Sequence, residues 1–441
     1  MRRPNIVVVQ TDQQRPDTIG TYGQALGVTP NLDHLAATGV VFESSFTVQP
    51  VCGPSRAALQ TGRWPTEIGC WRNGLGLDPS TPTLASRLAA LGYRSGYIGK
   101  WHLGSDHGPG RRSPRSLRYE KRAVPAERRG GYRDAWVAAD ALELTSGPFG
   151  GRMFDEDGEP YPLTGWRVDA VTAAALDRLR GFPTDEPFLL FVSYLEPHQQ
   201  NDRFRTVAPP GTACRYRHHA VPGDLAGTLG DWRWNYPATL ACAASIDANL
   251  GRILDALAAR GSLADTVVVF TSDHGSHYRT RNLEYKRSCH DASIRVPLVI
   301  AGPGFAGGRR DTRLVANTDL APTLLRAAGG DTTGLPGLAL QDEAATRDAL
   351  LVQISEHHLG RVIRTRDHTL AVRAHGVGRI GGMLRPAADR YRLAHLYDNG
   401  ADPHQRTNLA GHPSRRAQAG ELAGRLVDLI ETHEGHRPRI D

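Results

Sequence analysis

Four short runs of β-branched and aromatic residues constrain the fold of this chain more than any other feature. They lie at residues 5–10, 188–192, 266–270 and 296–300. Runs that are short and almost wholly apolar are typical of strands buried on both faces of a sheet. Segments with helical character, such as residues 83–91 and 238–259, separate them. This alternation predicts an α/β fold in which a large mixed, mostly parallel sheet is sandwiched by helices.

The last part of the chain has a different pattern. Short strand candidates at residues 350–354, 360–364 and 368–373 precede one terminal helix at residues 415–433. This order predicts a small antiparallel sheet with a terminal helix. The length of 441 residues accommodates both units. We therefore expect an α/β domain over residues 1–344 and a smaller α+β subdomain over residues 345–441. The Gly-, Pro- and charge-rich stretch at about 104–165 is expected to be a loop-rich insertion on the ligand side of the sheet.

Basic residues outnumber acidic ones, and much of the excess is local. The chain has 53 Lys and Arg against 46 Asp and Glu, a net charge of +7. Nine basic residues fall between positions 107 and 133: Arg111, Arg112, Arg115, Arg118, Lys121, Arg122, Arg128, Arg129 and Arg133. This segment is either a solvated loop or a rim that steers an anionic ligand toward a nearby site.

Cysteine usage and the N-terminal residues indicate the expected compartment. The five cysteines are scattered and form no CxxC pair, so the sequence supports neither a disulfide scaffold nor a zinc ribbon. Residues 1–10 lack the apolar core of a signal peptide, and no stretch reaches the length of a membrane span. The sequence therefore predicts a cytoplasmic protein without a membrane partner.

Metal-ligand residue types follow two of the expected strands. Asp12 comes just after the first run, and Asp273 and His274 come just after the run at 266–270. The carboxyl ends of parallel strands meet at one edge of an open sheet, where ligands bind. Carboxylates suit Ca²⁺, Mg²⁺ or Mn²⁺, and an imidazole is compatible with each. An isolated Asp after a strand is more often a turn residue, so each position by itself is weak support for a metal site.

The segment around Cys52 carries the sharpest signal. Gly53 and Pro54 break the chain before a helix-like stretch, which places Cys52 near a helix N-terminus. Backbone amides and the helix dipole favour negative charge there. Taken alone, the motif fits a structural role as well as a functional one. In the structural interpretation Cys52 is a small buried residue and Arg56 is a member of an ion pair.

Together with Thr61-Gly62-Arg63, the stretch Cys52-Gly53-Pro54-Ser55-Arg56 resembles the hallmark Cys-x-Pro-Ser/Ala-Arg of the type I, formylglycine-dependent sulfatase family in the alkaline phosphatase superfamily. Further stretches that resemble the family follow in its order at residues 5–16, 92–104, 195–198, 271–275, 286–297, 317–325 and 396–409.

The resemblance implies a metal centre and a modified cysteine. The implied ligands of one divalent cation are Asp12, Gln13, Cys52, Asp273 and His274. Calcium is the cation expected first, with Mg²⁺ and Mn²⁺ as alternatives. Many family members have a second Asp where this chain has Gln13, so the cage carries one negative charge less. A dedicated maturation enzyme would convert Cys52 to formylglycine.

The resemblance also implies the roles of the other site residues. Arg56 and Lys100 would hold formylglycine and sulfate oxygens, and Lys286 would grip the sulfate with His198. His198 would act as general acid on the leaving alcohol, and His102 as base in the elimination step. The implied reaction is hydrolysis of a sulfate monoester by hydrated formylglycine, whose second hydroxyl then helps to expel inorganic sulfate.

Two other functions stay open at this point. A phosphonate monoester or phosphodiester hydrolase can share this fold, the modified cysteine and the metal site. The second alternative is a basic protein that binds polyanions and in which Cys52 stays unmodified, although no nucleic-acid module is recognisable. For the leading interpretation, we expect a small anionic substrate, a sulfate ester of a carbohydrate or other small alcohol.

Overall fold

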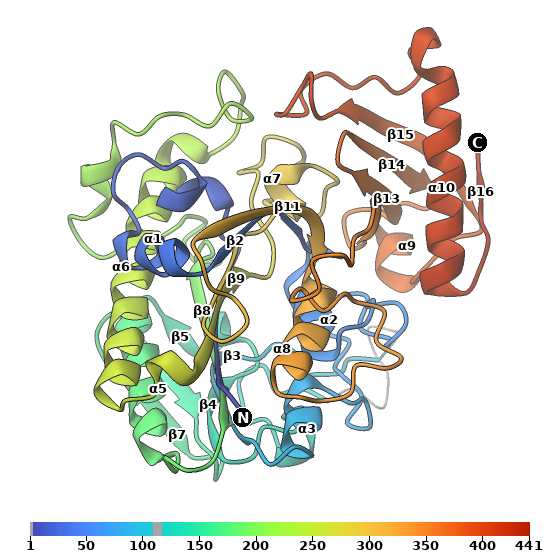
Figure 1. Cartoon of the computed structure of the whole chain (residues 1–441). Helices are drawn as coiled ribbons and strands as arrows, with labels where there is room; N and C mark the ends of the chain where they lie inside the picture. The colour runs from blue at the N-terminus through green and yellow to red at the C-terminus, as the bar shows by residue number, and fades with distance from the viewer. Residues whose placement is uncertain (1–2, 109–116) are drawn as a thin grey trace.

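A computed structural model of the chain describes residues 3–108 and 117–441 (Figure 1). Its large sheet has eleven strands. From one edge to the other they are β11 (Arg309–Ala316), β2 (Val40–Phe46), β10 (Leu298–Ala301), β9 (Thr266–Ser272), β1 (Asn5–Asp12), β8 (Phe188–Pro197), β3 (Arg94–Lys100), β4 (Ala135–Ala139), β6 (Gly150–Phe154) and β5 (Ser146–Gly147), with β7 (Pro160–Leu163) paired to β6. The five strands from β9 to β4 run parallel, whereas β10 and β6 run antiparallel to their neighbours. The predicted mixed sheet is confirmed.

Helices cover both faces of this sheet, as Figure 1 shows. On one face, Val7 and Val9 of β1 pack in a core with α1 (Pro30–Thr38), α5 (Arg167–Gly181) and α6 (Trp232–Ala259). On the other face, Ile6 and Val8 pack in a core with α2 (Cys52–Thr61), α3 (Leu84–Ala89) and α8 (Leu320–Ala327). Successive side chains of a strand point to opposite faces, so a run that is apolar at every position requires two covering layers.

The stretch at 104–165 differs from the expectation of a loop-rich insertion. It contributes strands β4 to β7 and the short helix α4 (Leu142–Thr145) to the fold. Three of the five residues of β4 are Ala, which has low strand propensity, so the local sequence gave a weak strand signal. The strand forms because it is buried against β3. Three of the basic residues noted above, Arg111, Arg112 and Arg115, lie outside the described residues.

The C-terminal part forms a separate five-stranded sheet. Its strands are, in order, β12 (Ala349–Ile354), β13 (Gly360–Thr365), β14 (His368–Ala374), β15 (Arg390–Asp398) and β16 (Arg439–Ile440). The first four are antiparallel, and β16 runs parallel to β15. Helix α10 (Arg416–Glu434) packs on this sheet through Leu422, Leu426 and Ile430, and α9 (Arg379–Leu384) precedes β15. The predicted small sheet with a terminal helix is confirmed.

Among the described helices, none is long and apolar enough to cross a membrane.

Candidate active site

The carboxyl ends of β1 and β9 bring two buried carboxylates together. Thr11 of β1 lies opposite Ser272 of β9, so Asp12 and Asp273 emerge side by side at the same edge of the sheet. Both side chains are fully buried. The backbone amide of Gln13 donates to Asp273 Oδ1 at 3.0 Å and joins the two strand ends.

Cys52 completes a compact cluster with these residues. It is the first residue of α2, and its Sγ lies 3.2 Å from His274 Nε2 and 3.6 Å from Asp12 Oδ1. Candidate ligand atoms of Asp12, Cys52, Asp273 and His274 all lie within 4.8 Å of one another. Lys286 Nζ donates to Cys52 Sγ and lies 2.9 Å from both this sulfur and His274 Nε2. The predicted residues are therefore assembled at one point in space.

The donor set at this point suits a divalent cation. The Gln13 side chain donates through Nε2 to Gln199 Oε1 at 2.7 Å, while its buried Oε1 has no hydrogen-bond partner among the described residues. A buried acceptor without a partner is costly unless a cation or another donor meets it. His274 Nδ1 donates to the carbonyl oxygen of Gly275 at 3.0 Å, which leaves the lone pair of Nε2 toward the cluster. Two carboxylates, an amide oxygen and an imidazole nitrogen are ligands that such an ion accepts.

Two buried cations face the carboxylates. Arg56 donates to Asp273 Oδ2 at 3.1 Å and to Asp12 Oδ2 at 3.2 Å, and Lys100 Nζ donates to Asp12 Oδ2 at 2.9 Å. Burial raises the pKa of Asp12, but Lys100 and other nearby cations outweigh it and hold this pKa below its ordinary value. Burial and the neighbouring Asp12 instead raise the pKa of Asp273. The two carboxyl groups are thus electrostatically distinct although they are neighbours.

The same cations act on the thiol. Burial raises the pKa of Cys52. The charges of Lys286, Lys100 and His274 lower this pKa by more than burial raises it, so the net pKa lies well below its ordinary value. A hydrogen bond from His102 acts in the same direction. Residue 52 therefore occupies a position where negative charge is strongly stabilised, as the helix N-terminus predicts.

The two remaining predicted histidines lie at the ends of β3 and β8. His102 follows β3 and adopts a left-handed backbone conformation with φ of 63°. Non-glycine residues in this region are strained, and the surrounding structure must hold them there. His198 directly follows β8 and is almost completely buried, and its charge lowers the pKa values of Asp12 and Glu143. Its Nδ1 donates to the carbonyl oxygen of Gln199 at 2.7 Å, so Nε2 is the nitrogen free to exchange a proton.

Two residues of the site were missed in the sequence. Glu143 of α4 accepts from Lys100 Nζ at 3.2 Å, and Ser193 of β8 accepts from Arg56 Nη1 at 2.6 Å. Ser193 had a detectable signal because it interrupts an otherwise apolar run. Glu143 had none, since it lies in the stretch that we expected to form loops.

A cavity of about 270 Å³ opens beside Lys286. Gln199, Asn201, Arg279 and Tyr285 are among the residues that line it. Lys286, whose Nζ donates to Cys52 Sγ, lines this cavity, so the cavity lies beside the cluster.

The helix-covered mixed sheet gathers carboxylates, imidazoles and cations around Cys52, a potential nucleophile. This arrangement is typical of a hydrolase of anionic esters. The sequence model of the family "Sulfatase" matches residues 4–330, and the chain belongs to this family. It is a sulfuric ester hydrolase, and its reaction is hydrolysis of a sulfate monoester.

One named relative agrees with this assignment, and two solved structures share the fold. The Ulvan-active sulfatase of Formosa agariphila is 30% identical over 448 residues, which cover 96% of this chain and 80% of the relative. A structure solved in complex with its substrate D-glucosamine-2-N,6-O-disulfate has a TM-score of 0.78 at 22% identity and covers 99% of both chains. A phosphonate monoester hydrolase from Silicibacter pomeroyi has a TM-score of 0.69 at 20% identity, covering 98% of this chain and 96% of the other. The fold alone therefore does not separate sulfate from phosphonate esters.

Proposed function

We propose that the working enzyme carries formylglycine at position 52, made from Cys52 by a separate maturation enzyme, and hydrolyses a sulfate ester of a carbohydrate beside a bound Ca²⁺ ion. The observation that carries this proposal is the position of Cys52. It begins α2 inside the cluster of Asp12, Asp273 and His274, and it accepts a hydrogen bond from Lys286 at 2.9 Å.

The ion would be held by Asp12, Gln13, Asp273, His274 and the oxygen of modified residue 52. Three of these four unmodified residues offer oxygen, which supports a hard cation such as Ca²⁺. When bound, such an ion stabilises negative charge and lowers the proton affinity of a nearby hydroxyl. Arg56 and Lys100 orient the carboxylate ligands, because each donates to them from within the buried site.

The remaining residues act on the sulfate group and on protons. A sulfate ester keeps negative charge on its non-bridging oxygens and gains charge on the bridging oxygen in the transition state, so donors aimed there lower the barrier. Lys286 and Lys100 supply positive charge around residue 52, as their effect on the pKa of Cys52 indicates. His198 Nε2 gives a proton to the leaving oxygen, while its Nδ1 stays bound to Gln199. His102 takes the proton from residue 52 in the elimination step.

Mass spectrometry of the peptide that contains residue 52 tests this proposal directly. We expect a mass loss equal to replacement of CH₂SH by CHO in active enzyme. Cys52→Ala and Cys52→Ser should both lose activity on a sulfate ester by several orders of magnitude, since neither can form a geminal diol. The matched control Cys214→Ser changes an exposed cysteine and should retain activity. Full activity in a preparation whose Cys52 is entirely unmodified would contradict the proposal, as would turnover by Cys52→Ser.

The cavity beside Lys286 supports a carbohydrate substrate. Its volume of about 270 Å³ lies just below the range of about 300–1,000 Å³ usual for ligand pockets and suits one sugar ring. The side chains of Gln199 and Asn201 can bind sugar hydroxyls. Comparing kcat/KM for monosaccharide sulfates, aryl sulfates and choline sulfate tests this class. Equal or better turnover of choline sulfate would exclude it.

The phosphonate monoester or phosphodiester hydrolase is the second candidate, supported by the shared fold. Turnover of paired aryl sulfate and aryl phosphonate esters by one preparation distinguishes the two. We expect the sulfate to be the better substrate.

A further inference from the structure

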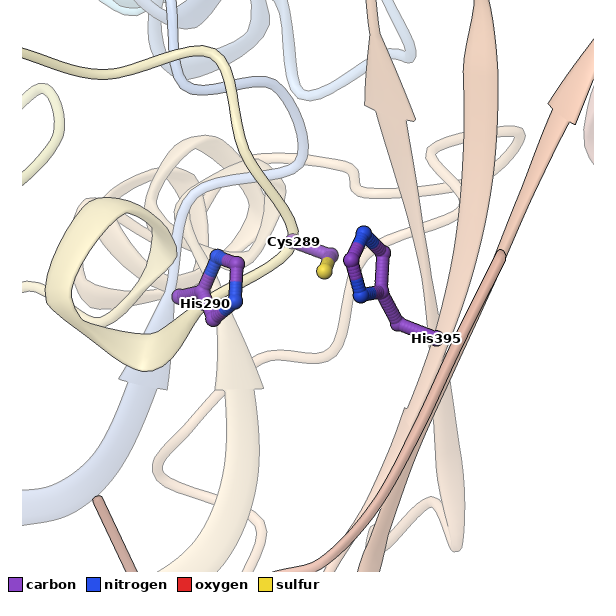
Figure 2. A group of neighbouring side chains, drawn as sticks. All are labelled: Cys289, His290 and His395. Carbon is purple, nitrogen blue, oxygen red and sulfur yellow. The ribbon is translucent and has the colours of Figure 1, made fainter. Parts of the chain in front are cut away.

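A second group of metal-ligand side chains lies outside the active site. Cys289, His290 and His395 each place one ligand atom within 4.8 Å of those of the other two. Cys289 and His290 end the loop that precedes α7 (Asp291–Ile294), whereas His395 belongs to β15. Figure 2 shows the sulfur of Cys289 between the two imidazole rings. Both residues of the loop are buried, and His395 is partly buried.

The surrounding hydrogen bonds orient both imidazoles. Ser288 Oγ lies 3.1 Å from His290 Nδ1, so Nδ1–H can donate to it and leave the lone pair on Nε2. The Tyr397 hydroxyl lies 3.0 Å from His290 Nε2 and 3.2 Å from His395 Nδ1. These two nitrogens therefore both face the Tyr397 hydroxyl oxygen. The Asn408 amide, at 3.4 Å from His395 Nδ1, is a weak competitor for that nitrogen.

We propose that Cys289 Sγ, His290 Nε2 and His395 Nδ1 bind one Zn²⁺ ion, with the Tyr397 hydroxyl beside the fourth coordination position. One thiolate and two imidazoles are a ligand set that Zn²⁺ accepts in tetrahedral sites. Binding releases the proton of the Cys289 thiol to solvent and involves no oxidation or reduction.

The charges around the cluster favour a thiophilic ion over Ca²⁺ or Mg²⁺. The positive charge of Arg281 acts on Cys289, His290 and His395, and that of Arg373 acts on Cys289 and His395, while the negative charge of Asp291 acts on Cys289 alone among the three. A cation held mainly by charge would be repelled there, whereas the zinc–thiolate bond has covalent character and brings a compensating negative charge. The sulfur and nitrogen ligands also differ from the oxygen-rich active-site cluster, so the two sites select different metals.

The site has a neighbouring cavity and a structural consequence. His290 lines a cavity of about 590 Å³, to which Arg281 and Asp291 also contribute. The cavity therefore lies beside His290, which is 5% exposed. Because Cys289 lies on the same loop as Lys286, an ion shared with His395 would fasten the lysine-bearing loop to the C-terminal sheet.

Cobalt substitution tests the site in the full-length protein. The background is Cys52→Ala, which removes the thiol of the active-site cluster. We expect metal-stripped Cys52→Ala protein to bind Co²⁺ with a thiolate-to-cobalt charge-transfer band that Zn²⁺ abolishes by displacement; Co²⁺ at the oxygen-rich active-site cluster, which has no thiol in this variant, gives no such band. Adding Cys289→Ser should remove the band. Adding the matched control Cys242→Ser, a buried thiol that donates to the carbonyl oxygen of Val207, should preserve it.

His395→Gln provides an independent variant, since His395 is only partly buried and its loss spares the packed core. In the Cys52→Ala background it should lower bound zinc by about one equivalent, measured by elemental analysis after dialysis. Zinc should raise the Tm of the Cys52→Ala protein more than that of the variant that also carries His395→Gln. Absence of the band at saturating Co²⁺, or a band and zinc content that persist in Cys289→Ser and His395→Gln, would overturn the proposal.

Discussion

Replacing Glu143 with Gln tests how strongly the site depends on the buried contact with Lys100. Glu143 Oε1 accepts from Lys100 Nζ at 3.2 Å, and its side chain is 12% exposed. Burial raises the pKa of Glu143, but Lys100 above all lowers it, and the result is a pKa of about 2 against an ordinary value of 4.5. The ionised carboxylate is therefore more stable in the folded protein than in the unfolded chain.

This difference sets the expected size of the effect. One pKa unit corresponds to about 1.4 kcal/mol, so the gap between 4.5 and about 2 gives about 3 kcal/mol of folding free energy. Because the folded pKa is the lower one, the stabilisation is present above the unfolded pKa and is lost as the pH falls toward the folded value. Glu143→Gln should therefore cost about 3 kcal/mol at neutral pH. One pH unit below the unfolded pKa, that cost should be about 1.4 kcal/mol smaller.

Urea unfolding of the wild-type protein and of Glu143→Gln, at neutral pH and at a series of lower pH values, measures this difference. Asp348→Asn is the control, because the Asp348 side chain is 92% exposed in its pair with Arg425 and should change stability by less than about 0.5 kcal/mol. A Glu143→Gln cost below about 0.5 kcal/mol at neutral pH would refute the reasoning. A cost that stays constant as the pH falls would refute the assigned sign.

Three further predictions concern packing and charge. Gly99→Ala should destabilise the protein by several kcal/mol in urea unfolding, because Gly99 has φ of 111° and a Cβ would lie 2.0 Å from the carbonyl oxygen of Ser193. Wild-type stability of this variant would show that β3 and β8 can separate without cost. Glu196→Gln should cost about 3–5 kcal/mol by the same measurement, since Arg167 donates to Glu196 at 2.6 Å and both are buried; a smaller loss than that of Asp348→Asn would contradict this. Gln13→Asp should tighten Ca²⁺ binding roughly tenfold, or about 1.4 kcal/mol, in calorimetric titration, because it adds a negative charge to the cage; unchanged affinity would place residue 13 outside it.

The agreement between sequence and structure depends on how local each signal is. Apolar runs such as residues 188–192 predict buried strands because a strand covered on both faces must be apolar at every position. The sequence did not predict the short Ala-rich strand β4, because this strand is stabilised by burial against β3 and not by the strand propensity of its own residues. The proposed boundary between residues 344 and 345 stays a prediction, although each side contributes its own sheet.

The sequence by itself determined which strands end in ligand-type residues and which helix begins at Cys52, because both follow from local patterns along the chain. The tertiary structure alone decided that Glu143 contacts Lys100 and that His395 lies beside Cys289. Such contacts join segments distant in the chain, and they depend on sheet order and helix packing. No local pattern of residues encodes that geometry, so these partners became visible only in the folded molecule.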